Sequence, residues 1–318
     1  MKKHILVTHT DIDGIGALTL FRSICNEYGL NGEEHSVEIN DVDDILRSII
    51  DKDLSKNKVV NLYIVDVTPK DPAVIERLNY YSHYANIVLL DHHETAIDRF
   101  VGYENWAEIN TEMCGAFAFW RYLSCNKREY DRVTECFYSY MHTVDAADRW
   151  LKESMPEDFF VGRRHALLLN VLETEEYISN RLFMIDPDQF TDSEKNVLSV
   201  LEAEQAAYVD EKIKSIVTYN HVDGGLNFPI AVIFCDRYIS EIAEEMRVRG
   251  MTDYVAVAGI YMSSKTVSLR SIQDDFHVGE FAKQMSSRGG GHPKSAGFSI
   301  EDDTRINSFI QNVFTGKE

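Results

Sequence analysis

The stretch that decides the fold of this chain is Ile87-Val88-Leu89-Leu90-Asp91-His92-His93. Its four apolar residues are typical of a strand that is buried on both faces of a parallel sheet. A carboxylate and two imidazoles follow directly, and such groups are costly in an apolar core unless they are paired or bind a metal. The stretch therefore predicts a buried strand that ends at a metal site.

Two further apolar runs end in similar groups. Ile5-Leu6-Val7 comes before His9-Thr10-Asp11-Ile12-Asp13-Gly14, and Leu62-Tyr63-Ile64-Val65 comes before Asp66. Each motif alone is compatible with an ordinary turn. Ligands of open parallel sheets bind at the carboxyl ends of the strands, so three such motifs on three strands favour one shared site.

Short apolar runs alternate with helical patterns in the first half of the chain, which predicts a parallel sheet covered by helices. The expected strands are 5–8, 37–40, 61–65, 86–90 and the less regular 103–106. The expected helices are 14–28, 42–50 and 72–82, followed after residue 114 by a wholly helical stretch.

A long polar helix is expected from residue 192 to residue 218, and strands return beyond a turn-rich stretch at 220–225. The pattern therefore predicts an α/β fold in three parts. An N-terminal parallel-sheet domain occupies residues 1–190, a helical connector residues 191–222, and a smaller mixed α/β domain residues 223–318.

Composition narrows the classes of function. The 318 residues carry a net charge of −20, which argues against a basic face for long nucleic acid. The five cysteines form no C-x-x-C pair, which argues against a disulfide framework or a zinc ribbon. The start of the chain lacks a signal-peptide pattern, and no apolar run approaches the ~20 residues of a membrane span. We therefore expect a cytoplasmic protein that does not contact membranes.

Several carboxylates that share a buried site need a compensating cation, because unpaired buried charge is unfavourable. The three strand-end motifs contain no Lys or Arg. A divalent metal is the natural partner, and mixed imidazole and carboxylate ligands suit Mn²⁺, with Mg²⁺ and Co²⁺ as alternatives. Asp145, in Val144-Asp145-Ala146-Ala147-Asp148, is a further candidate ligand, whereas Asp148 is expected to support it or to pair with Arg149.

Near the C-terminus, Arg288-Gly289-Gly290-Gly291-His292-Pro293-Lys294 combines three glycines with cationic side chains. Consecutive glycines let the backbone approach a ligand and present N–H groups to an anion, although such segments are also common in surface loops. Upstream, Arg270 lies in an expected strand, where its guanidinium fork suits a phosphate.

Together these motifs resemble the DHH phosphoesterase superfamily with its C-terminal DHH-associated domain, and they occur in that family's order over nearly the whole chain. The motifs that carry the resemblance are H-T-D-I-D-G, V-D-V-T-P, L-L-D-H-H, V-D-A-A-D, S-L-R-S and G-G-G-H-P-K-S-A-G-F.

The resemblance implies a centre of two divalent metals, most often Mn²⁺. His9 and Asp11 would bind one metal, Asp13, His92 and Asp145 the other, and Asp66 would bridge them. The resemblance also implies that Asp91 orients the histidines and that His93 contacts either the substrate or a metal ligand. The substrate would be bound by Arg270, Gly289, Gly290, Gly291 and His292.

His9 stands two residues before Asp11, and this H-x-D-x-D-G spacing is similar to the branch that includes oligoribonucleases and the RecJ type. We expect hydrolysis of short oligoribonucleotides or linear dinucleotides to nucleoside monophosphates. Cyclic-dinucleotide hydrolysis, RecJ-like exonuclease activity and a non-catalytic nucleotide-binding regulator are the alternatives. The sequence shows no aromatic platform for single strands, long duplexes are not expected as partners, and the oligomeric state is left open.

Overall fold

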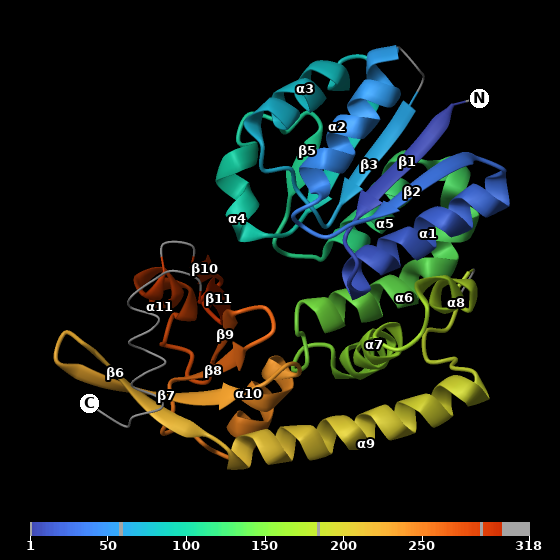
Figure 1. Ribbon diagram of the computed structural model, residues 1–318. Coiled ribbons are helices and arrows are strands. Elements are labelled where there is room, and N and C mark those ends of the chain that lie inside the picture. The colour runs from blue at the N-terminus through green and yellow to red at the C-terminus, as the bar shows by residue number, and fades with distance from the viewer. Residues whose placement is uncertain (1, 57–59, 183–184, 287–288, 301–318) are drawn as a thin grey trace. The chain divides into compact units, whose positions relative to one another are not determined.

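The computed structural model describes residues 2–56, 60–182, 185–286 and 289–300 (Figure 1). The chain divides into two compact units, residues 1–198 and residues 199–318. None of the helices in the described ranges combines the length and the apolar character that a membrane span requires.

The first unit is built on a five-stranded sheet in the order β2-β1-β3-β4-β5. Every neighbouring pair of strands is parallel. The carboxyl ends of the strands therefore lie along one edge of the sheet. The strands are β1 (Lys3–Thr8), β2 (Asn31–Ser36), β3 (Val60–Val65), β4 (Asn86–Asp91) and β5 (Ala107–Ile109).

Helices cover both faces of this sheet (Figure 1). One face packs alternate strand residues, such as Ile5 and Leu62, against α2 (Val42–Lys52) and α3 (Pro72–Ser82). On the other face Tyr63 contacts Phe21 of α1 and Phe119 of α5, with ring centroids 6.3 Å and 5.1 Å away. Burial on both faces explains why the strand sequences are continuously apolar. The helix bounds are α1 (Ile12–Tyr28), α4 (Glu94–Ile97), α5 (Gly115–Asn126), α6 (Asp131–Asp148), α7 (Pro156–Leu169) and α8 (Thr174–Ser179).

The second unit contains a mixed six-stranded sheet in the order β10-β11-β9-β8-β7-β6, in which only β7 and β8 pair in parallel. The helix α9 (Asp192–Lys214) leads into it, α10 (Ile239–Val248) packs on one face and α11 (Val278–Met285) on the other. The strands are β6 (Val217–Asp223), β7 (Leu226–Phe234), β8 (Ala256–Tyr261), β9 (Thr266–Ser271), β10 (Gly290–Gly291) and β11 (Ser295–Ser299).

The α/β class and the parallel sheet are as predicted, but three expected elements differ. The second strand is the polar 31–36 and not 37–40, because an edge strand needs no apolar alternation to pair with β1. The fifth strand is 107–109, since Tyr103 and Trp106 pack against Phe100 instead. The expected helical connector 191–222 is helical only to Lys214, and its last residues form β6 of the second sheet.

A buried polar network fixes the start of α9 in the first unit. Arg181 is 1% exposed and donates hydrogen bonds from Nε to His165 Nδ1 (3.0 Å) and from Nη2 to Glu194 Oε1 (2.9 Å). His165 Nε2 donates to the carbonyl of Pro187 (2.8 Å), so the imidazole is neutral with its proton on Nε2. Glu194 also accepts from the backbone N–H of Thr191, which makes the reciprocal cap of α9.

This network predicts a pH-dependent stability. Burial, with the charge of Arg181, lowers the pKa of His165 to about 3, against about 6.5 in the unfolded chain. The unfolded state therefore binds a proton that the native state excludes, and the stabilisation is complete above pH 6.5 and is lost as pH falls towards 3. The expected loss is about 1.4 kcal/mol per pH unit.

The measurement is the free energy of unfolding between pH 6 and pH 4 for the wild type and for His165→Gln. The variant should start less stable but should lose stability less steeply as pH falls, because the glutamine does not titrate. Parallel pH profiles for the two proteins would contradict the neutral, buried state of His165.

Candidate metal centre

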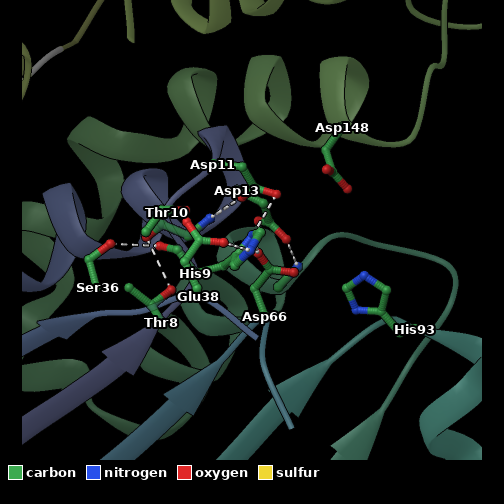
Figure 2. A network of polar contacts seen from close by, with 12 residues as sticks. Thr8, His9, Thr10, Asp11, Asp13, Ser36, Glu38, Asp66, His93 and Asp148 are labelled. Carbon is green, nitrogen blue, oxygen red and sulfur yellow. Dashed lines mark hydrogen bonds and ion pairs between the residues drawn. The ribbon is translucent and has the colours of Figure 1, made fainter. Parts of the chain in front are cut away.

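The polar groups of the three motifs meet at the carboxyl edge of the first sheet (Figure 2). His9 follows β1, Asp66 follows β3, and His92 follows β4 directly. Asp11 and Asp13 lie at the start of α1, which begins where the chain leaves β1. The structure thus brings together five of the six predicted metal ligands from three separate segments.

His9, Asp11 and Asp66 form the first group. His9 Nδ1 lies 2.8 Å from Asp11 Oδ2 and 3.9 Å from Asp66 Oδ2. The other oxygen of Asp11 accepts the backbone N–H of Gly14 (3.1 Å) and caps α1. A side chain at position 14 is excluded, because a Cβ there would lie 2.2 Å from the carbonyl oxygen of His9.

His92, Asp13 and Asp148 form the second group, and Asp66 also reaches it. His92 Nε2 lies 3.7 Å from Asp13 Oδ2, 3.5 Å from Asp66 Oδ1 and 3.4 Å from Asp148 Oδ2. In each group the candidate ligand atoms lie within 4.8 Å of one another. One oxygen of Asp66 therefore faces His9 and the other faces His92.

The N-terminus of α5 donates hydrogen bonds to two buried carboxylates. Asp13 accepts hydrogen bonds from the N–H groups of Gly115 (2.7 Å) and Ala116 (2.6 Å), and Asp145 accepts one from Cys114 (2.7 Å). A helix N-terminus carries partial positive charge and stabilises anions. Gly115 is needed there, since a Cβ would lie 2.8 Å from the Cβ of Asp66.

Asp66 itself adopts a strained backbone. Its φ of 60° lies in the left-handed region, which residues with a Cβ rarely occupy. Such strain persists where the surroundings impose it, and it is common at functional sites. Here the close approach of α5 and the bond from Asp66 N–H to the Leu90 carbonyl (2.9 Å) hold the residue in place.

The two carboxylates of α6 contact different partners. Asp145 was expected to be a ligand, but its oxygens contact the N–H of Cys114 and the guanidinium of Arg149 (3.4 Å). Asp148, expected to play the supporting role, is the residue that faces His92. The two residues lie one turn apart on neighbouring sides of α6, about 60° apart around its axis, and of the two only Asp148 forms an ion pair with His92.

His93 and Asp91 form a pair beside the cluster. Asp91 is 1% exposed, and its Oδ1 accepts a hydrogen bond from His93 Nδ1 (2.8 Å). This bond raises the pKa of His93. Asp91 thus orients the second imidazole, while the first, His92, points into the carboxylates.

The charges of this cluster are not balanced by the protein. Burial, together with the charges of Asp13 and Asp11, raises the pKa of Asp66 well above its usual range. Within the described ranges, every ion pair of these three aspartates is with a histidine. Asp66 Oδ2 and Asp148 Oδ2 are buried and accept no hydrogen bond there. Clustered oxygens and imidazoles of this kind fit divalent cations.

The sequence did not predict one further acidic residue beside His9. Glu38 accepts a hydrogen bond from the Thr10 hydroxyl (2.8 Å), and its Oε2 lies 3.9 Å from His9 Nε2. It stands two residues beyond β2, at the same edge of the sheet. Because the second strand was expected at 37–40, Glu38 was placed inside a strand instead of after one.

In the second unit, Arg270 and the glycine segment lie on the two strands that flank β11. Arg270 of β9 is opposite Ser295 of β11, which pairs in turn with β10 at Gly290 and Gly291. His292 donates its backbone N–H to the Ser295 carbonyl (2.7 Å), which closes the turn from β10 to β11. Gly289 precedes β10, so all of the predicted substrate-binding residues lie on or beside the three neighbouring strands β10, β11 and β9.

Comparisons with known proteins agree with this architecture. Residues 234–315 match the DHHA1 domain. The chain is 26% identical to the oligoribonuclease NrnB of Bacillus subtilis (strain 168), over 97% of this chain and 75% of that protein. Two structures of the exonuclease RecJ bound to manganese resemble its fold at 14% identity over 99% of this chain. One gives a TM-score of 0.53 over 90% of that chain, and the protein from Thermus thermophilus gives 0.55 over 52%.

Residues 234–315 thus match a DHHA1 domain, and the fold of the whole chain resembles that of a manganese-bound exonuclease.

The two carboxylates of α6 should respond differently to substitution. Asp148→Asn should weaken Mn²⁺ binding more than about tenfold, because it replaces an anion that faces His92. Asp145→Asn should chiefly lower the Tm, because the charge-assisted bond from Cys114 is worth about 1–3 kcal/mol. Calorimetric titration with Mn²⁺ and thermal unfolding of both variants check this, and the opposite pattern would restore Asp145 as the ligand.

Asp66→Asn should stabilise the protein in a chelator while abolishing its stabilisation by Mn²⁺. The substitution removes a buried charge that other carboxylates repel, but it also removes the anion that reaches both groups. Thermal unfolding with EDTA and with Mn²⁺ measures both effects, with the wild type as the reference. A variant that Mn²⁺ stabilises as much as the wild type would show that Asp66 is not a ligand.

Proposed function

We propose that this chain is a phosphodiesterase that depends on two divalent cations and hydrolyses short oligoribonucleotides or linear dinucleotides to nucleoside monophosphates. The observation that carries the proposal is the position of Asp66, whose two oxygens face two separate groups of candidate ligands. The substrate class is supported by the 26% identity to an oligoribonuclease over nearly the whole chain.

In this proposal His9 and Asp11 hold one cation, Asp13, His92 and Asp148 hold the other, and Asp66 serves both. Mn²⁺ is the favoured ion, with Mg²⁺ and Co²⁺ as alternatives. Bound cations of this kind supply an activated water and stabilise the charge that develops on the phosphoryl oxygens. The α5 N-terminus fixes Asp13 in position through its two N–H bonds.

His93 is the group proposed to contact the scissile phosphodiester. Its imidazole is held by Asp91 and lies beside His92, with ring centroids 4.6 Å apart. Asp91 would act through His93, as a positioning residue that fixes the orientation of the ring. These two different roles explain why the carboxylate of Asp91 is buried while His93 is about half-buried.

The second unit is proposed to bind the substrate. Residues 1–190 would then contain the catalytic groups, and residues 223–318 would contain the substrate-binding groups. Arg270 donates to the hydroxyls of Ser240 (2.9 Å) and Ser268 (3.1 Å) and to the Leu269 carbonyl (2.9 Å). These hydrogen bonds are to neutral groups, Glu241 acts on the charge of Arg270, and a guanidinium fork of this kind suits a phosphate. Gly289, Gly290, Gly291 and His292 would present backbone and side-chain donors beside it.

The test is Mn²⁺-dependent hydrolysis of end-labelled RNA from dinucleotide to 20-mer, with single-stranded DNA and cyclic dinucleotides alongside. Fast cleavage of the shortest RNAs to monophosphates is expected, and Asp66→Asn should reduce it by several orders of magnitude. Preference for long DNA or cyclic dinucleotides would overturn the substrate class. An absence of cleavage with any substrate would favour a nucleotide-binding regulator instead.

A further inference from the structure

A cluster of aromatic side chains lies on the helical hairpin formed by α5 and α6. Phe117 and Trp120 of α5 have ring centroids 5.2 Å apart, and Tyr138 and His142 of α6 are 4.5 Å apart. The two pairs join across the hairpin, since Phe117 is 4.9 Å from His142 and Trp120 is 5.4 Å from Tyr138. We call these four residues the aromatic strip.

The strip lies on the outer side of the hairpin. The neighbouring residues Phe119 and Phe137 are fully buried, so the hairpin has its core on the other side. Tyr138 is 51% exposed and the other three rings are half-buried. Trp120 is held by a hydrogen bond from its Nε1 to the Thr134 carbonyl (2.7 Å). The strip is therefore a rigid, partly exposed aromatic surface.

The strip lies on the same two helices that contribute to the candidate metal centre. Phe117 stands two residues after Gly115, whose N–H binds Asp13. His142 precedes Asp148 by six residues on α6, and Tyr138 precedes it by ten. At 1.5 Å per residue these separations are about 9 Å and about 15 Å along the helix. Along α6, the strip therefore lies about 9 to 15 Å from Asp148, farther than the length of one nucleotide.

We propose that the aromatic strip binds nucleobases of the RNA chain that lie beyond the nucleotide at the metal centre. The proposal rests on the proposed function and adds a second contact region to it. Bases stack on aromatic side chains with about 1–3 kcal/mol per base and with little sequence preference. For a chain with a net charge of −20, contacts to bases are also a better source of affinity than contacts to phosphates.

The chain offers a matched control. Tyr80, Tyr81 and Tyr84 form a second aromatic cluster, with centroids 5.1 Å and 5.5 Å apart, and Tyr84 is 75% exposed. This cluster lies just before Asn86, where β4 begins, and the metal centre lies where β4 ends. An alanine at position 84 removes an exposed ring of the same type at the opposite edge of the sheet.

The experiment compares Tyr138→Ala, Tyr138→Phe and Tyr84→Ala with the wild type on RNAs of two, three and five nucleotides. Tyr138→Ala should raise the KM for the pentamer about tenfold, as expected for one lost stacking contact. Its kcat, its Tm and its KM for the dinucleotide should stay unchanged. Tyr138→Phe keeps the ring, so it should behave as the wild type does, and so should Tyr84→Ala.

Equal KM values for the pentamer in Tyr138→Ala and the wild type would overturn the inference while leaving the proposed function intact. An equal loss in Tyr138→Phe would also overturn it, because the hydroxyl and not the ring would then be responsible. A change of oligomeric state in Tyr138→Ala without a change of KM would assign the strip to a second copy of the chain.

If the wild type cleaves no RNA, the proposed function fails and the strip is tested by binding alone. Fluorescence anisotropy of a labelled RNA pentamer in EDTA then replaces the kinetic readout. Weaker binding by Tyr138→Ala than by Tyr84→Ala would support the strip, and equal binding would overturn it.

Discussion

The crowding of buried carboxylates at one edge of a parallel sheet is the constraint on which the rest of this structure depends. Asp13 and Asp66 are each at most 3% exposed, and they share their site with Asp11 and no partner more basic than histidine within the described residues. The N-terminus of α5 offsets part of the unfavourable energy of burying these carboxylates, because it donates hydrogen bonds from two N–H groups to Asp13. The remainder requires cations from outside the protein.

The same constraint explains local features that otherwise look unfavourable. Asp66 tolerates a left-handed backbone because β4 and α5 confine it, and Gly14 and Gly115 occur where the chain passes within contact distance of other backbone. The buried carboxylates lower the stability of the fold at this edge of the sheet. The strands that helices cover on both faces and the Arg181 network at the start of α9 contribute compensating stability. The second unit keeps its own core on both faces of its sheet.

The sequence predicted that the strand-end side chains would meet, because each stands directly after an apolar run, and that relation is local. The prediction was wrong for β2, because its polar residues pair at the edge of the sheet. As a result, Glu38 was not predicted to lie near His9. The choice between Asp145 and Asp148 depended on the rotation of α6, which a motif does not specify. The aromatic strip was not predicted either, because Phe117 and Tyr138 come together only when α5 and α6 pack.

The most direct test of the central claim is anomalous diffraction at the manganese edge from crystals grown with Mn²⁺. The account predicts two manganese peaks on either side of Asp66, one beside His9 and Asp11 and one beside Asp13, His92 and Asp148. A single peak, or two peaks that do not share Asp66, would contradict the view that this carboxylate organises a two-cation site.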